Sequence, residues 1–381
     1  MCGIAGFVND MPIDVKCPVL QRMTDMIAHR GPDSEGHYID EHAALGHRRL
    51  SIIDLGGGQQ PIYNEDGSKV ITFNGEIYNY QTLREELIAA GHTFTTKSDT
   101  EVLLHGYEQW GVDLLQRVRG MFTFVIWDKN KQELFGARDH FGIKPFYYAK
   151  MNGTFMYASE IKSLLRHPDF VKELNAEALK PYMTFQYPAI GETFFKGVYK
   201  LPEGHYFTYR DGKMDIHRYY DEDFREGKQK LGELVNSIDQ TVCDSVKAHQ
   251  IADVEVGSFL SSGVDSSYVA AVARPQHTYS IGFGKGTYNE SQQAGELAEL
   301  LKLNNTAESL TDEEAFAAFP RIQWHLDEPD SNPSCVPLYF LSALAAKDVK
   351  VVLSGEGADE LFAGYIDYGV HTKFRPIKVV T

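Results

Sequence analysis

From residue 231 onward, short apolar segments alternate with longer amphipathic ones, and this alternation constrains the fold more than any other feature of the sequence. The apolar segments predict strands at residues 254–260, 278–283 and 349–353. The amphipathic segments predict helices at residues 231–249, 265–273, 291–301 and 335–346. Strands that alternate with helices form parallel sheets, because parallel neighbours need a crossover connection. We therefore expect an α/β domain built on a parallel sheet.

The first part of the chain follows a different pattern and is rich in strands. Runs of β-branched and aromatic residues predict strands at residues 4–8, 70–73, 121–127 and 155–157. Between them, amphipathic segments predict helices at residues 19–28, 80–90 and 101–110. The polar segment 221–230 predicts a linker. We expect two domains, residues 1–220 and 231–381, each long enough to bury its own hydrophobic core.

The charge and the cysteine content limit the partners and the compartment. A net charge of −16 repels phosphate backbones and anionic lipids, so we expect no nucleic acid and no membrane partner. The four cysteines, Cys2, Cys17, Cys243 and Cys335, form no CxxC pair, which leaves zinc and thioredoxin-type sites without support. The sequence shows neither a signal peptide nor a membrane-spanning apolar run, so a cytoplasmic location is expected. A homodimer is an open possibility.

Cys2 is the most informative single residue, because removal of Met1 would make it the first residue of the chain. It would then carry both a thiol and a free α-amine, whose reference pKa of about 8 is close to that of a thiol. The amine can accept the thiol proton and act as general base, as the α-amine of an N-terminal threonine does in other hydrolases. Taken alone, a cysteine at this position is explained equally well by chance.

Cys2 is accompanied by an ordered set of short motifs. They are CGIAG at residues 2–6, HRGPD at 29–33, RLSI at 49–52, NGEIYN at 74–79 and SD at 98–99. This set resembles the class II, N-terminal-nucleophile glutamine amidotransferases. The resemblance implies an α+β domain over residues 1–220, an αββα sandwich with antiparallel sheets. It also implies that Cys2 hydrolyses glutamine through a thioester, and Arg30 is expected to order a loop that closes over the substrate.

The resemblance assigns residues to each polar group of glutamine. The side chain of Asn74 and the backbone amide of Gly75 would stabilise the oxyanion formed when the thiolate attacks. The guanidinium of Arg49 would bind the α-carboxylate, and Asp99 would bind the α-ammonium group. The implied glutamine-binding set is Arg49, Ile52, Asn74, Gly75, Glu76 and Asp99. Considered singly, Asn74-Gly75 is a common hairpin turn and Arg49 an ordinary surface charge.

A second group of residues indicates a phosphate site. The predicted strand at 254–260 leads into a loop of serine and glycine, residues 261–267, and then into a helix. Such a loop presents backbone N–H groups and a helix N-terminus to an anion. The Walker pattern is absent, but the loop resembles the SGGxDS loop of ATP-pyrophosphatases. The first glycine of that pattern is Ser262 here, which is tolerated if its φ angle stays negative.

Two further loops extend the resemblance. Ile281 lies in a segment that the family uses to approach adenine, and SGEGADE at residues 354–360 is closely similar to asparagine synthetases. Asp265 and Asp359 would hold Mg²⁺, which prefers hard oxygen ligands. Glu356 would face the reacting centre as a catalytic group. The implied set for ATP and pyrophosphate is Leu260, Ser261, Ser262, Gly263, Val264, Asp265, Ser266, Ile281, Ser354 and Gly355.

Together these motifs predict a glutamine-dependent asparagine synthetase that uses glutamine, aspartate and ATP. Ammonia from glutamine would attack a β-aspartyl-AMP intermediate. Other class II amidotransferases, such as the phosphoribosyl and glucosamine-phosphate enzymes, lack a pyrophosphate loop. Two alternatives stay open: a related ligase that amidates another carboxylate, and a fragment that only hydrolyses glutamine or binds a partner. Family members extend well past the segment at 354–365, so we expect the second domain to be incomplete at its C-terminal end.

Overall fold

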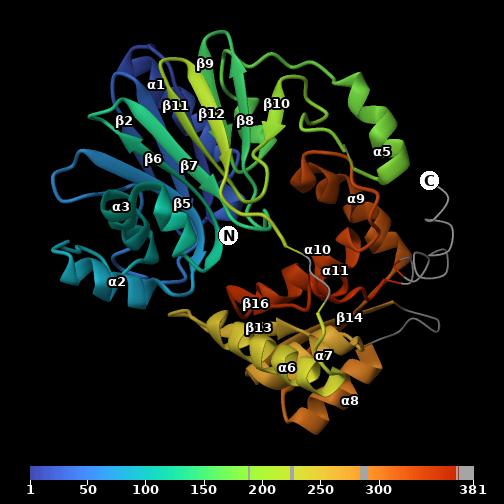
Figure 1. The fold of residues 1–381 in the computed structure, drawn as a ribbon. Helices are drawn as coiled ribbons and strands as arrows, with labels where there is room; N and C mark the ends of the chain where they lie inside the picture. Colours follow the sequence, from blue (N-terminus) through green and yellow to red (C-terminus); the bar gives the residue numbers. More distant parts are fainter. Residues whose placement is uncertain (188, 224–226, 284–290, 366–367, 369–381) are drawn as a thin grey trace, which may run out of the picture. The chain divides into compact units, whose positions relative to one another are not determined.

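The computed structural model describes residues 1–187, 189–223, 227–283, 291–365 and 368 (Figure 1). The chain divides into two compact units. The first comprises Met1–Lys228 and Gln323–Asn332, and the second comprises Gln229–Ile322 and Pro333–Thr381. The expected domain boundaries stay a prediction, and residues 224–226 of the expected linker lie outside the described residues. Within the described ranges, no helix is both long and apolar enough to cross a membrane.

The first unit contains two six-stranded antiparallel sheets. One sheet has the order β10-β8-β9-β1-β3-β2, with strands β1 (Gly3–Val8), β2 (Ser34–Ile39), β3 (Ala43–Arg49), β8 (Tyr147–Met151), β9 (Thr154–Ala158) and β10 (Val198–Lys200). The other has the order β12-β11-β7-β6-β5-β4, with strands β4 (Ile62–Tyr63), β5 (Lys69–Ile77), β6 (Gly120–Asp128), β7 (Glu133–Arg138), β11 (His205–Arg210) and β12 (Lys213–Arg218).

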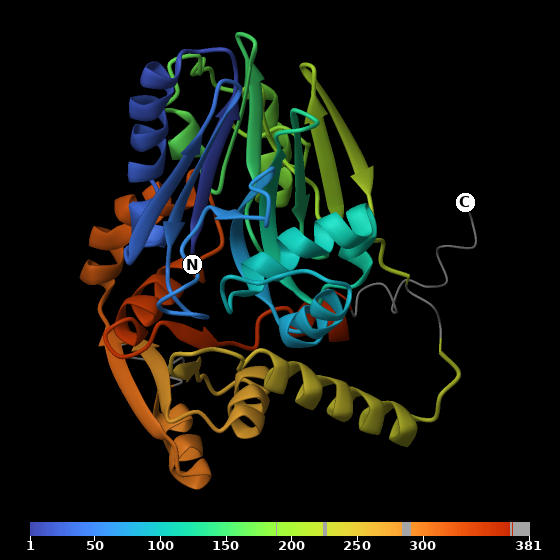
Figure 2. The same ribbon diagram turned by 90° about the vertical axis from the view of Figure 1, so that its left-hand side faces the viewer.

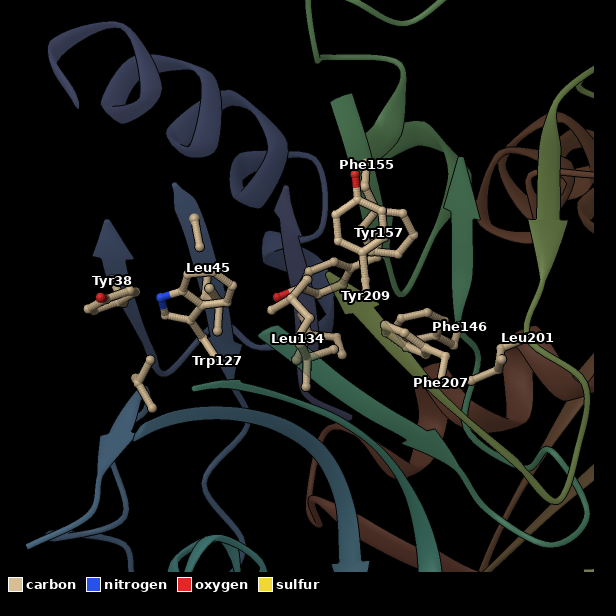
Figure 3. Close-up of a cluster of buried hydrophobic side chains, with 14 residues drawn as sticks. Tyr38, Leu45, Trp127, Leu134, Phe146, Phe155, Tyr157, Leu201, Phe207 and Tyr209 are labelled. Atoms are coloured by element: carbon tan, nitrogen blue, oxygen red, sulfur yellow. The ribbon is translucent and has the colours of Figure 1, made fainter. Parts of the chain in front are cut away.

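A hydrophobic core joins the facing sides of these two sheets. Side chains alternate along each strand, so every second residue of a strand points to the same face. Leu45 and Tyr157 of one sheet pack in a single buried cluster with Trp127 and Phe207 of the other. Figure 3 shows the aromatic side chains of this cluster gathered between strands of the two layers. Burial of large aromatic surfaces is a principal source of stability for such a sandwich.

Helices cover the outer faces of the sandwich. Helices α1 (Ile13–Asp25) and α4 (Ile161–Leu164) pack on the sheet that contains β1, and α3 (Asp99–Trp110) packs on β5 of the other sheet, with α2 (Tyr80–Ala89) beside α3. Figure 2 shows α1 in dark blue on one side of the two sheets and the light-blue and cyan helices on the other. These layers confirm the expected αββα sandwich. The remaining helices of this unit are η1 (Ala28–Arg30), η2 (Gly111–Gln116), η3 (Ala176–Ala178) and α5 (Leu179–Phe185).

The second unit contains a four-stranded parallel sheet of order β15-β14-β13-β16. Its strands are β13 (Val256–Phe259), β14 (His277–Phe283), β15 (Asn304–Leu310) and β16 (Val351–Leu353). The helices between and beside them are α6 (Leu231–Ala248), α7 (Val264–Ala273), α8 (Ser291–Leu301), α9 (Asp312–Leu326, crossed by the division between the units), α10 (Cys335–Ala345) and α11 (Ala358–Phe362). The expected parallel α/β arrangement is confirmed.

Candidate active site

The pairing of β1 with β3 determines where Cys2 lies. The two strands run antiparallel with Gly3 opposite Arg48, so the residue before β1 lies beside the residue after β3. The Cys2 sulfur accepts a hydrogen bond from the backbone N–H of Leu50 at 3.4 Å, and it lies 3.6 Å from the Leu50 carbonyl oxygen. The Arg30 Nε donates to the carbonyl oxygen of Cys2 at 2.9 Å. Hydrogen bonds to its carbonyl oxygen from Arg30 and to its sulfur from Leu50 therefore fix the position of the candidate nucleophile.

The surroundings of Cys2 act differently on its thiol and on the α-amine of the chain. Burial raises the pKa of the Cys2 thiol, while the hydrogen bond with Leu50 and the charge of Arg49 act in the opposite direction. Burial also lowers the pKa of the Met1 α-ammonium group to about 5, and the charges of Arg30 and Lys144 lower it as well. The Cys2 thiol is therefore protonated at neutral pH, whereas the α-amine of Met1 is uncharged.

Strand β5 carries three of the predicted site residues at its C-terminal end. Asn74 and Glu76 are two residues apart and so project from the same face of the strand. Asn74 is 1% exposed, and within the described residues its Nδ2 has no hydrogen-bond partner. Glu76 Oε2 is likewise buried without a hydrogen-bond partner there. A buried amide donor left unpaired costs free energy unless a ligand satisfies it.

Gly75 between them is required by packing as well as by any ligand. A Cβ atom at this position would lie 2.2 Å from the carbonyl oxygen of Met121 and 2.7 Å from the Cα of Phe122 on the neighbouring strand β6. Both contacts are with backbone atoms, which cannot move aside. Gly75 therefore has a packing role besides the oxyanion contact that the resemblance implies.

Glu76 and Asp99 form a pair of buried carboxylates. Asp99 begins helix α3, where its Oδ2 accepts a hydrogen bond from the backbone N–H of Ile77 at 3.0 Å. Burial raises the pKa of Asp99 to about 6, and burial together with the charge of Asp99 raises the pKa of Glu76 well above its usual value. Two like charges in one buried place are costly, and a cation placed between them would remove that cost.

Arg49 supplies the complementary positive charge. The residue is buried, and its guanidinium donates to the backbone carbonyl oxygens of Ile53 at 3.0 Å, Asp54 at 2.7 Å and Leu55 at 3.4 Å. Gly58 makes room for the guanidinium, since a Cβ there would lie 2.7 Å from its NH2. No ion pair joins Arg49 to a carboxylate of the described residues. Ile52, half-buried, lies in the segment that leads from Arg49 to these carbonyls.

Lys144 is a residue of this site that the sequence did not predict. Lys144 is 4% exposed and follows β7 in the chain, in the segment FGIKP at residues 141–145. Its Nζ donates to the Met1 sulfur at 2.9 Å. Burial lowers the pKa of Lys144 to about 8, against the opposing charges of Glu76 and Asp139. A lysine between apolar residues was the only signal in the sequence, and the same pattern is common in solvent-exposed turns.

A buried ionic network lies behind Arg30. Its NH1 donates to Glu160 Oε1 at 2.9 Å, and the His29 Nε2 lies 3.0 Å from the same oxygen. Lys162 Nζ is 2.6 Å from Glu160 Oε2 and 2.9 Å from Asp327 Oδ1, and Asp327 belongs to the Gln323–Asn332 part of the first unit. Burial alone would raise the pKa of Glu160, but the hydrogen bond with His29 and the charges of Arg30 and Lys162 lower it to about 2.

In the second unit, the predicted pyrophosphate loop joins β13 to α7. The Ser266 hydroxyl binds the backbone N–H of Ser261 at 3.1 Å and the Ser261 hydroxyl at 2.8 Å. The backbone N–H of Gly263 donates to the Ser261 hydroxyl at 3.1 Å. Ser262 does not have a positive φ angle, as its Cβ requires. Gly263 has φ −69° and ψ 151°, an extended conformation open to other residues, so this loop does not use the special freedom of glycine.

The other predicted residues of this half lie on or after neighbouring strands of the sheet. A Cβ at Gly355 would be 2.8 Å from the Cβ of Asp265, so the loop after β16 touches the start of α7. The backbone N–H of Leu260 donates to the carbonyl oxygen of Tyr279 on β14, two residues before Ile281. Ser354 and Glu356 are exposed between β16 and α11, as is Val264 at the start of α7. Asp265 and Asp359 both stand in first turns of helices and are half-buried, which suits oxygen ligands for a cation.

Comparisons with known proteins also divide the chain into two parts. A family described as glutamine amidotransferase domain matches residues 1–220, and a family described as asparagine synthase matches residues 237–377. "Asparagine synthetase (glutamine-hydrolyzing) 1" of Bacillus subtilis is 44% identical over 99% of this chain, which covers 61% of that protein. A Methanocaldococcus jannaschii protein, provisionally named asparagine synthetase (glutamine-hydrolyzing) 2, is 34% identical over 97% of this chain and 76% of its own length. The chain thus spans less than two thirds of the Bacillus relative.

Proposed function

Since the chain belongs to the family of glutamine-hydrolysing asparagine synthetases, we propose that Cys2 releases ammonia from glutamine and that the second unit transfers it to aspartate. Both steps are proposals for this chain, because it covers only part of the Bacillus relative. The acyl acceptor is taken as aspartate, in keeping with the names of the relatives.

The observation that carries the glutaminase proposal is a set of buried charged and polar groups near one thiol, each suited to one polar group of glutamine. Arg49 is a buried cation without a carboxylate partner in the described chain, and it suits the α-carboxylate of glutamine. Glu76 and Asp99 are crowded carboxylates that suit the α-ammonium group. The unpaired Nδ2 of Asn74 suits the oxyanion. The charges of Arg49 and Glu76 both act on the Cys2 thiol, which links these groups to the nucleophile.

In the proposed reaction one amine accepts and donates a proton twice, once as the thioester forms and once as it is hydrolysed. The free α-amine of Cys2 takes the proton of its own thiol, and the thiolate attacks the side-chain amide carbon of glutamine. Asn74 Nδ2 and the Gly75 N–H stabilise the oxyanion. When the tetrahedral species collapses, the protonated amine gives its proton to the leaving nitrogen, ammonia departs and a thioester remains. Water, deprotonated by the same amine, then cleaves the thioester to give glutamate and restores the thiol.

The second unit is proposed to activate aspartate with ATP. The N–H groups of residues 261–266 and the start of α7 would face the phosphates, with Asp265 and Asp359 as ligands of Mg²⁺. Bound Mg²⁺ would neutralise charge on the departing pyrophosphate. Ammonia then displaces AMP from β-aspartyl-AMP, and Glu356 assists that attack. A homodimer and a cytoplasmic location stay predictions.

Separate measurement of the two half-reactions tests the proposal. Glutamate release is followed with glutamine alone, and pyrophosphate and asparagine formation with aspartate, ATP, Mg²⁺ and ammonium chloride. Asp265→Asn should abolish pyrophosphate formation and leave glutamate release unchanged, because Asp265 belongs to the second unit. Glutamate release by the unaltered chain that is no faster than the buffer rate would contradict the proposed glutaminase.

A further inference from the structure

Two histidines and two glutamates meet on the surface of the first unit, away from the residues assigned above. Glu65 lies in the turn between β4 and β5, His92 follows α2, and His105 and Glu108 lie on α3. One donor atom from each of these four side chains lies within 4.8 Å of the other three. We refer to these four residues as the His–Glu cluster. It takes no part in the proposed glutaminase or synthetase chemistry.

The histidine rings of the cluster are both oriented with Nδ1 toward carboxylates. His92 Nδ1 lies 3.1 Å from Glu65 Oε1. His105 Nδ1 lies 3.3 Å from Glu65 Oε2 and 3.1 Å from Glu108 Oε2. The side chain of His105 is 1% exposed, whereas that of Glu65 is 37% exposed. The cluster is therefore closed on the helix side and open to solvent on the Glu65 side.

The second nitrogens of the two rings differ in their contacts. His92 Nε2 is 3.3 Å from the side-chain oxygen of Gln109. His105 Nε2 is buried 3.6 Å from Glu101 Oε1, beyond hydrogen-bond distance, and has no hydrogen-bond partner among the described residues. A neutral imidazole has only one N–H, so its other nitrogen presents a lone pair. If each Nε2 carries the hydrogen, both Nδ1 lone pairs point at carboxylate oxygens. Something positive must occupy the space between them, either a proton on each ring or a cation.

The spacing of the donor atoms suits a particular cation. Zinc holds imidazole nitrogens and carboxylate oxygens about 2.0–2.2 Å away, which places tetrahedral ligands about 3.3–3.5 Å apart. The three distances between Nδ1 and carboxylate atoms are 3.1, 3.3 and 3.1 Å. We propose that the His–Glu cluster binds one divalent transition-metal ion, Zn²⁺ above all, through His92 Nδ1, His105 Nδ1 and the carboxylates of Glu65 and Glu108.

The outer contacts of the cluster have the form that metal sites use. An N–H of a ligating histidine commonly donates to a carboxylate or carbonyl oxygen, which fixes the ring and its tautomer. The side-chain oxygen of Gln109 fills this role for His92 at 3.3 Å. Glu101, held by the backbone N–H groups of Thr95 at 2.7 Å and Thr96 at 2.6 Å, lies 3.6 Å from His105 Nε2, beyond hydrogen-bond distance. Asn64 Nδ2 holds the other oxygen of Glu108, Oε1, at 2.7 Å. Glu108 Oε2 is thereby left for the metal.

The surroundings of the cluster show how an ion would enter and which segments it would join. A cavity of about 300 Å³ is bordered by Glu65 and Glu101 but not by His92, His105 or Glu108, so an ion would reach the cluster past the partly exposed carboxylate of Glu65. The bound ion would fasten the β4–β5 turn and the segment after α2 to helix α3. Asp99 begins that helix, so the ion would stabilise the element that carries a predicted glutamine contact. Zinc had no support in the sequence because that expectation rested on cysteine spacing, and these four ligands share no motif.

The test uses the full chain after dialysis against a chelator, with Co²⁺ as a spectroscopic probe and Zn²⁺ as competitor. Tetrahedral Co²⁺ absorbs strongly in the visible range, whereas octahedral Co²⁺ on oxygen ligands, as at a Mg²⁺ site, absorbs weakly. Binding to the Cys2 thiolate would add a sulfur charge-transfer band in the near ultraviolet. We expect one tetrahedral Co²⁺ per chain without that band, full displacement by Zn²⁺, and a higher unfolding temperature with Zn²⁺.

Single substitutions of the cluster histidines test whether the ion binds there. His105→Asn should lose the tetrahedral spectrum. His92→Asn is the safer second variant for folding, because its ring is partly exposed, and it should weaken Co²⁺ binding at least about tenfold. His42→Asn is the matched control, since His42 contacts a single carboxylate, Asp10, at 3.7 Å. Absence of a tetrahedral spectrum in the unaltered chain, or its persistence in His92→Asn at full affinity, would show that protons alone fill the cluster.

Discussion

The Nε of Arg30 donates a hydrogen bond of 2.9 Å to the carbonyl oxygen of Cys2, and the same guanidinium pairs with Glu160 through NH1. Arg30 thus joins the backbone of the candidate nucleophile to a buried ionic network. The sequence led us to expect a loop-ordering role for Arg30. The contact indicates a more direct one, in which Arg30 fixes the position of the residue that attacks.

Replacement of Arg30 by alanine should therefore lower kcat for glutamine hydrolysis. A displacement of the nucleophile by about 1 Å costs about 100-fold in rate, and we expect a loss of that order. Arg30→Lys keeps the charge without the planar fork and should recover only part of the rate. Arg117→Ala, which removes an exposed arginine paired with Glu86, is the control. Steady-state glutamate release at saturating glutamine measures the effect, and an unchanged kcat in Arg30→Ala would refute it.

A second prediction follows from the unpaired Nδ2 of Asn74. If its Nδ2 binds the oxyanion, its contribution appears only as the tetrahedral species forms. Asn74→Ala should then lower kcat by about 100- to 1,000-fold with little change in KM. A rise in KM at constant kcat would instead assign Asn74 to binding of the ground state. Initial rates over a range of glutamine concentrations separate the two outcomes.

Lys144 is predicted to control the pH at which the α-amine acts. Its ammonium group is one of the charges that lower the pKa of the Met1 α-ammonium group, and we expect it to act in the same direction on the α-amine of Cys2 once Met1 is removed. Removing that charge in Lys144→Met raises the pKa of the amine, so the acid limb of the kcat/KM profile should move to higher pH by about one unit. Because burial disfavours the charged lysine, the variant should still fold. Lys150→Met, an exposed lysine bound to the carbonyl of Gly212, should leave the profile in place.

Glu160 is predicted to make the first unit sensitive to acid. Its pKa in the folded chain is about 2, below the usual value of 4.5, so its stabilising contribution is complete above pH 4.5 and is lost as the pH falls toward 2. The loss amounts to about 3 kcal/mol at most. Burial raises the pKa of Asp327, so that residue contributes in the opposite sense. The difference between the unaltered chain and Glu160→Gln isolates the Glu160 term.

Tryptophan fluorescence is well suited to this measurement. All three tryptophans, Trp110, Trp127 and Trp324, belong to the first unit, so urea unfolding followed by their emission reports on that unit. The unfolding free energy should fall with decreasing pH more steeply in the unaltered chain than in Glu160→Gln. Parallel curves for the two proteins across pH 4.5 to 2 would contradict the account.

The sequence predicted the regular elements well where apolar residues recur with a clear period. Helix α8 spans the expected residues, Ser291–Leu301, and the parallel sheet is confirmed. Strand β15 was missed because its residues are mostly polar and exposed, and its pairing with β14 depends on backbone hydrogen bonds that carry no sequence signal. Helix α1 spans Ile13–Asp25 rather than the expected residues 19–28, and Pro18 lies inside it.

The residues of the candidate site likewise fall into those that the sequence could predict and those that it could not. Cys2, Arg49 and Asn74 could be proposed because each belongs to a short motif. Lys144 and Asp327 could not, since they reach the site only through the folding of distant segments, and neither lies in a motif of its own. The His–Glu cluster is a similar case, as its ligands come from a turn, a loop and a helix. The roles of all these residues stay predictions until they are tested in solution.

The most direct test of the central claim is glutamate release by Cys2→Ala, compared with the unaltered chain and with Cys17→Ala. Cys17 is an exposed thiol of helix α1 and provides the matched control. The intact mass of each protein establishes whether Met1 has been removed. We predict that the active chain begins at Cys2, that Cys2→Ala releases glutamate only at the background rate, and that Cys17→Ala retains full activity. Glutamate release by Cys2→Ala at the unaltered rate would contradict the proposed nucleophile.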